Sequence, residues 1–158
     1  MVRTGIGFDA HKLVDGRKLI LGGIEIKYHK GLLGYSDADV VCHAVADAIL
    51  GAAGLGDIGL MFPDTDPANK DISSLKILTA VNDKIKDYKY RVVNIDITII
   101  AEEPKISSYA EPMKKAISHT LGIDSNDINI KGKTTETLGF AGRKEGIAAL
   151  AVATIDKL

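Results

Sequence analysis

Apolar and polar residues alternate along several stretches of the chain in the way that half-buried strands do. The clearest stretch is 91–101, where four apolar side chains fall on one face: Val93, Ile95, Ile97 and Ile99. A second strand is expected over 2–13, loosened by Gly5 and Gly7, and a third over 128–130. The nearly unbroken apolar run 146–155 predicts a fourth strand that is covered on both faces.

Helical spacing of apolar residues fills the intervals between these strands. The first helix is expected to begin at Ser36, with Ser36 as its N-cap and Asp39 in its first turn, and to end near Gly54. Two further helices are expected over 73–87 and over about 108–121.

Two short apolar runs, 18–21 and 24–26, are joined by Gly22-Gly23 and predict a small N-terminal hairpin. Together these elements predict an α/β fold of the α+β type. We expect a single domain over residues 1–158, with a mostly four-stranded mixed sheet and helices packed on one face.

Charge and composition narrow the classes of function. The 158 residues carry 20 Lys and Arg against 21 Asp and Glu, without a basic run. This balance gives no electrostatic reason to expect binding to nucleic acid or to an anionic membrane, and no run approaches the roughly 20 apolar residues of a membrane helix. The single cysteine, Cys42, excludes an intrachain disulfide and fits a reducing compartment, so a soluble cytoplasmic protein is expected.

Three residues indicate a metal site. Asp9 and His11 are alternate residues of the first expected strand, so their side chains point to the same face. His43, in the first expected helix, is the best third donor. One carboxylate and two imidazoles with one open position are the ligands of a catalytic zinc. The plainer interpretation is a chance Asp-x-His pair and a packed histidine, and these residues alone leave both open.

The surroundings of His43 offer two interpretations. Asp39, His43 and Asp47 recur every four residues and share one helix face. We expect Asp39 or Asp47 to orient the imidazole through its second ring nitrogen, although an ordinary solvated stripe has the same pattern. Cys42 points about 100° away around the helix and is expected in the core.

Two further segments suit a phosphorylated substrate. Residues 131–136 place hydroxyls, backbone N–H groups and lysines after a strand, and Glu136 suits a hard cation such as Mg²⁺. The spacing is not that of a nucleotide P-loop. Residues 56–67, rich in Gly, Pro and Asp, form a candidate substrate loop. A plain turn explains either segment equally well when it is taken alone.

Several spaced motifs occur in one order along the chain: Gly7-Phe8-Asp9-Ala10-His11, Gly31-Leu32-Leu33, Ser36-Asp37-x-Asp39-Val40, His43-Ala44-x-x-Asp47-Ala48, Gly56-Asp57-Ile58-Gly59, Phe62-Pro63-Asp64-Thr65-Asp66, Thr134-Thr135-Glu136 and Gly142-Arg143-x-Glu145-Gly146. In this order they resemble the 2-C-methyl-D-erythritol 2,4-cyclodiphosphate synthase family over essentially the whole chain. Many motifs in the right order are far more specific than any one of them.

The resemblance implies a lyase of the non-mevalonate isoprenoid route. The substrate would be 4-diphosphocytidyl-2-C-methyl-D-erythritol 2-phosphate, whose 2-phosphate attacks the β-phosphorus and releases CMP. By resemblance, Zn²⁺ would be held by Asp9, His11 and His43, and Mg²⁺ or Mn²⁺ by Glu136, with Thr134 as a further catalytic residue. The family also implies a homotrimer with active sites between subunits and an axial cavity for an isoprenoid diphosphate, near Phe8, Arg143 and Glu145.

The same resemblance implies these substrate contacts: Ser36, Asp57, Gly59, Phe62, Asp64, Asp66, Ala101, Pro104, Lys105, Gly132, Lys133, Thr134, Thr135, Phe140 and Arg143. Three positions depart from the family pattern. Tyr35 stands where His is usual, Ala38 where Gly is frequent and Lys133 where Thr is frequent. A tyrosine hydroxyl donates to a phosphate but carries no positive charge.

Two other functions stay open at this point. A zinc phosphohydrolase or cyclic phosphodiesterase would use the same three ligands with water as nucleophile. A trimeric binding module for isoprenoid diphosphates would keep the fold without turnover, although the intact catalytic set argues against it.

Overall fold

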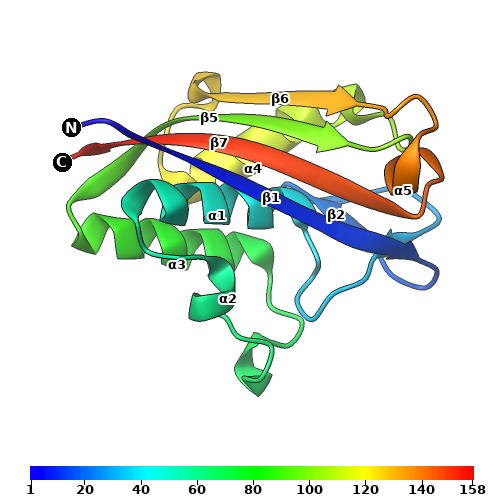
Figure 1. The fold of residues 1–158 in the computed structure, drawn as a ribbon, viewed down its shortest axis with the longest axis horizontal. Helices are drawn as coiled ribbons and strands as arrows, with labels where there is room; N and C mark the ends of the chain where they lie inside the picture. The colour runs from blue at the N-terminus through cyan, green and yellow to red at the C-terminus, as the bar shows by residue number, and fades with distance from the viewer.

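Four long strands form the sheet that carries the candidate site, and the computed structural model describes them together with all of residues 1–158. Their order across the sheet is β1, β7, β5 and β6 (Figure 1), and a two-residue strand, β4, extends the edge beside β1. The bounds are β1 (Arg3–Val14), β4 (Gly31–Leu32), β5 (Tyr90–Ile100), β6 (Ile128–Lys133) and β7 (Gly146–Lys157).

The sheet is mixed, because β7 runs antiparallel to both β1 and β5, whereas β5 and β6 are parallel. A separate hairpin joins β2 (Leu19–Leu21) to β3 (Ile24–Ile26) through Gly22 and Gly23, both with positive φ. The predicted fold class, mixed sheet and N-terminal hairpin are therefore confirmed, with β4 as a short fifth strand.

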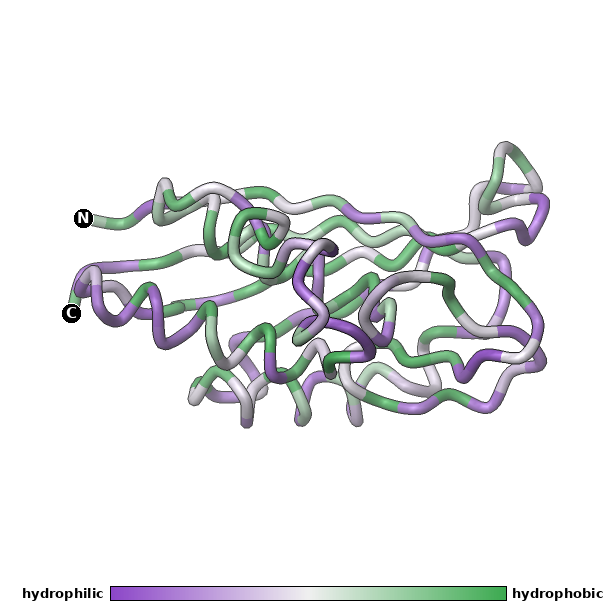
Figure 2. The backbone as a smooth tube through the Cα atoms, turned by 90° about the horizontal axis from the view of Figure 1, so that it is seen from below, coloured by the Kyte–Doolittle hydropathy of each residue, from purple (hydrophilic) through white to green (hydrophobic).

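The long helices lie on one side of the strands (Figure 2). They are α1 (Val40–Ala53), α3 (Ser74–Asp87) and α4 (Ala110–Leu121). Two one-turn helices, α2 (Ile58–Met61) and α5 (Gly139–Gly142), and three 3₁₀ turns (Pro67–Asn69, Ile106–Ser108 and Ser125–Asp127) lie in the connections. None of the helices has the length and apolar character needed to cross a membrane.

Helix α1 is the centre of the core, since twelve of its fourteen residues are buried. It packs against β1 and β7 on one side and against α3 on the other. Cys42 is among its buried residues, as predicted.

Gly5 and Gly7 allow this packing. A Cβ at Gly7 would lie 1.9 Å from the carbonyl oxygen of Ala44, and one at Gly5 would lie 2.2 Å from that of Ala48. Both distances are impossible contacts with helix backbone. The two glycines therefore do not loosen the strand, as the sequence suggested, but are the surface on which α1 rests.

The start of α1 differs from the prediction. Its N-cap is Asp39 rather than Ser36, and the Asp39 carboxylate accepts hydrogen bonds from the backbone N–H groups of Val41 and Cys42, both at 3.1 Å. Ala38 has a φ of 57°, in the left-handed region, so the helix cannot extend back through it. This conformation also explains why a glycine would suit position 38.

The Asp39 carboxylate also fixes the hairpin. It accepts the N–H of Gly22 at 2.9 Å and that of Gly23 at 2.7 Å, so one buried carboxylate joins the β2–β3 turn to the start of α1. Burial raises the pKa of Asp39, and the backbone N–H donors oppose that rise.

Three smaller expectations are corrected. A register shift in β5 between Val92 and Asn94 places Val92 inward and leaves Val93 39% exposed, because a bulge reverses the alternation. Helix α4 begins at Ala110 rather than near 108, after the 3₁₀ turn 106–108. Strand β7 is buried on its helix side, but on the other face Val152 is 37% exposed in the single chain.

We predict that Gly7→Ala lowers the free energy of unfolding by at least about 2 kcal/mol, since the added methyl meets a backbone carbonyl that no rotamer change relieves. Gly51→Ala is the matched control, because a Cβ there has only one neighbour, at 3.8 Å, and alanine favours the helix by about 0.5–1 kcal/mol. Urea unfolding of both variants measures this difference. Equal stability of the two variants would contradict the close-packing account.

Candidate metal centre and substrate clefts

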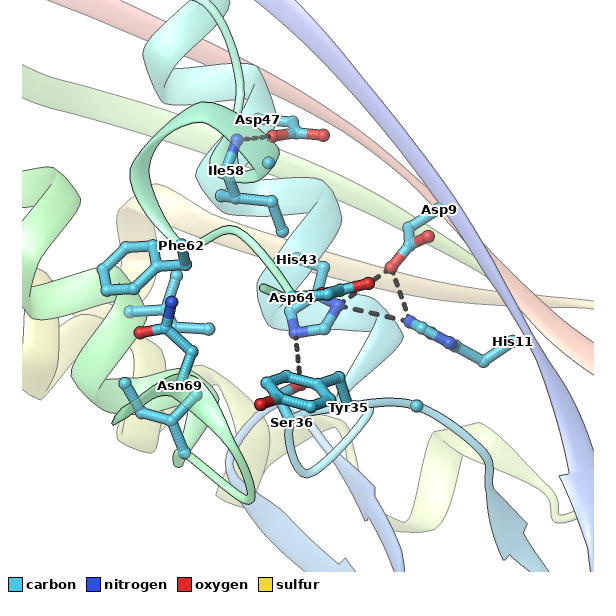
Figure 3. Close-up of a pocket in the computed structure, with 14 residues that line it drawn as sticks. Asp9, His11, Tyr35, Ser36, His43, Asp47, Ile58, Phe62, Asp64 and Asn69 are labelled. Carbon is cyan, nitrogen blue, oxygen red and sulfur yellow. Dashed lines mark hydrogen bonds and ion pairs between the residues drawn. The ribbon is translucent and has the colours of Figure 1, made fainter. Parts of the chain in front are cut away.

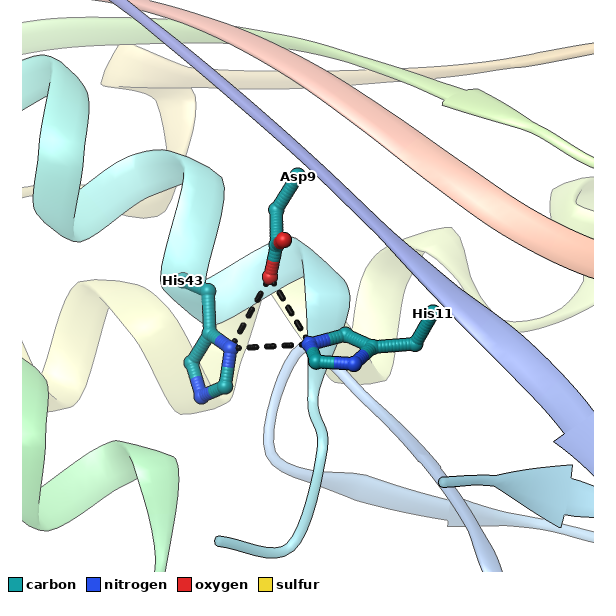
Figure 4. Close-up of side chains that lie close together, drawn as sticks. All are labelled: Asp9, His11 and His43. Carbon is teal, nitrogen blue, oxygen red and sulfur yellow. Dashed lines mark hydrogen bonds and ion pairs between the residues drawn. The ribbon is translucent and has the colours of Figure 1, made fainter. Parts of the chain in front are cut away.

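The structure brings the three predicted metal ligands together (Figure 4). Asp9 Oδ2 lies 2.9 Å from His11 Nε2 and 3.0 Å from His43 Nδ1. The two ring nitrogens are 3.2 Å apart. One oxygen and two nitrogens thus form a nearly equilateral triangle.

These residues fit a zinc ion. Tetrahedral coordination with bonds of about 2.0–2.1 Å separates neighbouring ligand atoms by about 3.3 Å, and the triangle needs only a slight expansion to reach that size. A carboxylate with two imidazoles is also a donor set that divalent transition metals bind well. The triad supplies three ligands of a divalent metal site and leaves one position for another molecule.

The fold explains how the triad forms. Asp9 and His11 are alternate residues of β1 and project to the side occupied by α1. His43 lies one turn into α1, and the glycine-lined contact holds that turn against the strand. Ligands 32 and 34 residues apart in the chain thereby meet.

Each imidazole is also held through its other ring nitrogen. His11 Nδ1 lies 2.9 Å from the carbonyl oxygen of Leu33. His43 Nε2 lies 2.9 Å from Ser74 Oγ and 3.1 Å from Ser36 Oγ. Such contacts fix ring orientation in metal sites and strengthen ligation.

The expectation that Asp39 or Asp47 orients His43 is wrong. Asp39 caps α1 and the hairpin, as described above. Asp47 accepts the backbone N–H of Ile58 at 2.8 Å and so anchors α2 (Figure 3). Helical spacing placed both acids on one face with His43, but each satisfies backbone donors in a neighbouring segment.

The charges of the triad reinforce one another. Burial disfavours ionisation of Asp9, but hydrogen bonds and charges from His11 and His43 outweigh burial and hold its pKa well below the usual range. Burial alone would lower the pKa of His11, and its contact with Asp9 reverses this, so that the pKa is raised above 6.5. The metal-free triad thus binds protons, and a metal cation has to displace them in order to bind.

The triad lines a cleft of about 300 Å³ (Figure 3). Four predicted substrate contacts line the same cleft: Ser36, Gly59, Phe62 and Asp64. Tyr35 lines it too, and its hydroxyl donates to the carbonyl of Asp66 at 3.3 Å. Asp57 and Asp66 are not lining residues, because Asp57 caps α2 and Asp66 caps the 3₁₀ turn 67–69.

A second cleft, of about 420 Å³, lies at the ends of β5 and β6. It contains six more of the predicted contacts: Ala101, Pro104, Lys105, Gly132, Lys133 and Thr134. No triad residue lines this cleft. The sheet register explains the separation, because Asp9, Ala149, Ile99 and Gly132 lie in one row across four strands. Three strand spacings put about 14 Å between the first and last backbone positions.

Thr135 and Glu136 follow in a tight turn that sequence reasoning did not fully describe. Glu136 and Thr137 have φ values of 54° and 68°, in the left-handed region that side chains disfavour. The Glu102 carboxylate holds the turn by accepting the N–H groups of Thr135 at 3.1 Å and Thr137 at 3.0 Å. Glu102 was missed because its partners are more than 30 residues away and no local pattern marks it.

Phe140 and Arg143, predicted substrate contacts, lie in neither cleft. Phe140 and Glu145 line a third hollow beside His11, and Arg143 Nε donates to Glu145 Oε1 at 2.8 Å. His11 lines this hollow as well as the first cleft, so the hollow adjoins the triad near the start of β7.

A family model described as the YgbB family matches residues 2–156. The chain belongs to the YgbB family. Among its relatives, the 2-C-methyl-D-erythritol 2,4-cyclodiphosphate synthase of Clostridium acetobutylicum is 61% identical over 151 residues, covering 96% of this chain and 97% of the relative. The synthase of Caldicellulosiruptor bescii is 56% identical, with coverage of 98% and 99%.

Solved structures agree with the sequence relatives. The bifunctional IspDF of Campylobacter jejuni superposes with a TM-score of 0.96 at 44% identity, and the match covers 100% of this chain but only 43% of that longer one. The Plasmodium falciparum IspF in its CDP complex gives 0.86 at 36% identity, with coverage of 99% and 96%.

These relatives confirm the predicted function and enzyme class, a cyclodiphosphate synthase of isoprenoid biosynthesis. An inactive binding module, which the sequence left open, is disfavoured by their consistent naming as synthases. The triad is consistent with a divalent metal in such an enzyme.

Metal binding is predicted to depend on pH. Only neutral imidazole binds a metal, so protons compete until the pH exceeds the raised pKa of His11. Below that pKa, zinc affinity should fall by about tenfold per pH unit for each proton displaced. Competition with a coloured chelator between about pH 5 and pH 8 measures this slope. A zinc affinity that stays constant over this range would contradict the assignment of His11 as a ligand.

Proposed function

We propose that the two clefts together bind 4-diphosphocytidyl-2-C-methyl-D-erythritol 2-phosphate and convert it to 2-C-methyl-D-erythritol 2,4-cyclodiphosphate and CMP. The observation that carries this proposal is the Asp9, His11 and His43 triangle, which opens into a cleft lined by the family's substrate motifs. The nucleophile is already a phosphate, so positioning and charge neutralisation are the main tasks of the site.

The cleft that the triad lines would hold the methylerythritol 2-phosphate. Ser36 lines it and can donate its hydroxyl to a phosphate oxygen. Tyr35 would have to give up its hydrogen bond to the carbonyl of Asp66 to donate in the same way. Asp57 and Gly59 lie around the start of α2, where a sugar-like polyol would sit. Asp9, His11 and His43 would hold Zn²⁺, which would supply a Lewis acid for the β-phosphate, the group that the 2-phosphate attacks.

The second cleft would hold the cytidine diphosphate end. Lys105 and Lys133 line it and supply positive charge, and Thr134 adds a hydroxyl. Glu136, in the turn after β6, would hold Mg²⁺ or Mn²⁺, which would neutralise charge on the substrate phosphates. Lys133 would add a positive charge beside the departing CMP.

Two copies of the chain would have to meet to unite the clefts. On the sheet face opposite the helices, Ile6 lies across from Val152 and Phe8 across from Leu150. Ile6 and Phe8 are 66% and 58% exposed, which is unusual for apolar side chains gathered on one face. This face supports the proposed homotrimer, in which the triad of one subunit would face the nucleotide cleft of its neighbour.

Three further features belong to the same proposal. Phe140, Arg143 and Glu145 would lie near an axial cavity that accepts an isoprenoid diphosphate. Residues 1–158 would form one synthase domain, and the single cysteine supports a cytoplasmic location.

The activity is tested by phosphorus NMR and mass spectrometry on purified protein with the cytidyl substrate, Zn²⁺ and Mg²⁺. We expect CMP and cyclic diphosphate in equal amounts, and His43→Ala should reduce turnover at least 100-fold because a metal ligand is lost. Inorganic phosphate or a ring-opened product would instead indicate a zinc phosphohydrolase that uses water.

Sites between subunits are tested by mixing two inactive variants, Asp9→Asn and Glu136→Gln. A shared site needs an intact triad from one chain and an intact turn from the other, so random assembly of equal amounts should restore about one quarter of the parental activity. Light scattering should give a trimer for both variants. A mixture as inactive as its components would show that each site lies within one chain.

A further inference from the structure

A buried chain of side chains runs from His43 away from the metal site. Ser74, which is fully buried at the start of α3, places its Oγ 2.9 Å from His43 Nε2. The same hydroxyl is hydrogen-bonded to Asp37 Oδ1. Asp37 Oδ2 also accepts the backbone N–H of Ser74 at 2.9 Å, and Oδ1 accepts that of Asp39 at 3.1 Å.

The direction of each hydrogen bond follows from what each group can donate. An ionised carboxylate only accepts, so the Ser74 hydroxyl donates its single hydrogen to Asp37. Ser74 Oγ can then only accept a hydrogen bond from His43. His43 Nε2 must therefore carry a hydrogen, so Nδ1, which lies 3.0 Å from Asp9 Oδ2, is the ring nitrogen whose lone pair a metal ion binds once it has displaced any proton there.

Ser36 does not change this assignment. Its Oγ accepts the backbone N–H of Ala38 at 3.1 Å and lies 3.1 Å from the same His43 nitrogen, which it can share as a second acceptor. The Ser36 hydroxyl hydrogen is then left for a ligand in the cleft. Ser74, by contrast, has its hydrogen committed to Asp37 and serves only His43.

We propose that Asp37 and Ser74 are positioning residues for the metal site. Ser74 holds the imidazole of His43 with Nδ1 toward the metal, and Asp37 fixes the direction of the Ser74 hydroxyl. The inference rests on the proposed function of the triad as a metal centre. The sequence predicted that Asp39 or Asp47 would orient His43. Ser74 and Asp37, from the segments after and before α1, take that role instead.

Asp37 also has a structural task, which the test has to separate. Ser73, the N-cap residue of α3, makes no capping hydrogen bond with its own side chain, and the Asp37 carboxylate supplies one from outside the helix. The Ser74→Ala variant keeps the backbone N–H that Asp37 accepts. It removes only the hydroxyl between Asp37 and His43.

The test compares zinc affinities, measured by chelator competition, of the parent and four variants. We expect Ser74→Ala to bind zinc about 10- to 100-fold more weakly, as is typical when the partner of a metal-bound histidine is removed. Ser73→Ala, one residue away, should bind like the parent, and Ser74→Thr, which restores a hydroxyl, should recover most of the loss. Asp37→Asn gives a second arm, because an amide replaces one of the acceptors, and should also weaken zinc binding.

A spectroscopic signature accompanies the affinities. In the zinc-loaded parent, the Nε2-bound hydrogen of His43 should give a slowly exchanging proton NMR signal, because it is buried and hydrogen-bonded. In folded Ser74→Ala the signal should shift and exchange faster, because Ser36 Oγ, 3.1 Å from the same nitrogen, is then the one acceptor left for this hydrogen. Zinc affinity of Ser74→Ala within threefold of the parent, or an equal loss in Ser73→Ala, would overturn the proposal.

These measurements need no turnover, so the two proposals fail separately. A parent that releases CMP while Ser74→Ala keeps full zinc affinity defeats only the positioning role. A parent whose zinc binding depends on Ser74 but which releases no CMP defeats only the proposed reaction.

Discussion

The close contact between β1 and α1 is the constraint on which the metal centre depends. Gly5 and Gly7 let the helix backbone approach the strand to a distance that no side chain would permit. The next inward-facing residues of the same strand are Asp9 and His11, so the contact that packs the core also brings His43 to them. Packing and chemistry share one strand face and cannot be altered independently.

Helix α1 is also held in place by carboxylates that accept hydrogen bonds from backbone N–H groups of neighbouring segments. Asp39 joins the start of α1 to the β2–β3 turn, and Asp47 holds α2 against its side. Asp37 acts in the same way on α3. These acids make the cleft rigid where the ligands stand, and rigid support is what holds a metal site in productive geometry.

The sheet separates the triad from the second cleft, although the proposed diphosphate substrate would have to contact both. The row from Asp9 to Gly132 places the triad and the second cleft at opposite edges of the four strands. Apolar side chains exposed on the open face, such as Phe8, are where a second copy would pack. In the proposed trimer, assembly of the active site and burial of that face would be one event.

Much of this was predictable from the sequence. Strand alternation and helix periodicity predicted the sheet and the three long helices and put Asp9 and His11 on one face. His43 was the best third donor by residue type, and the family resemblance favoured it as the third ligand. Features set by tertiary contact were not predictable. The bulge at Val93 reversed the alternation, and Ser74 and Glu102 act on partners 31 or more residues away. The role of Asp39 was predicted wrongly because its four N–H donors come from two segments. The helix pattern reveals the start of α1, but nothing local reveals the β2–β3 turn.

The most direct test of the account is a crystal structure of the zinc-loaded protein with anomalous diffraction at the zinc absorption edge. We predict one peak per chain at the triangle, bonded to Asp9 Oδ2, His11 Nε2 and His43 Nδ1, with Ser74 still on His43 Nε2. Zinc bound elsewhere, or bound through the other nitrogen of His43, would contradict the account of how β1 and α1 build the site.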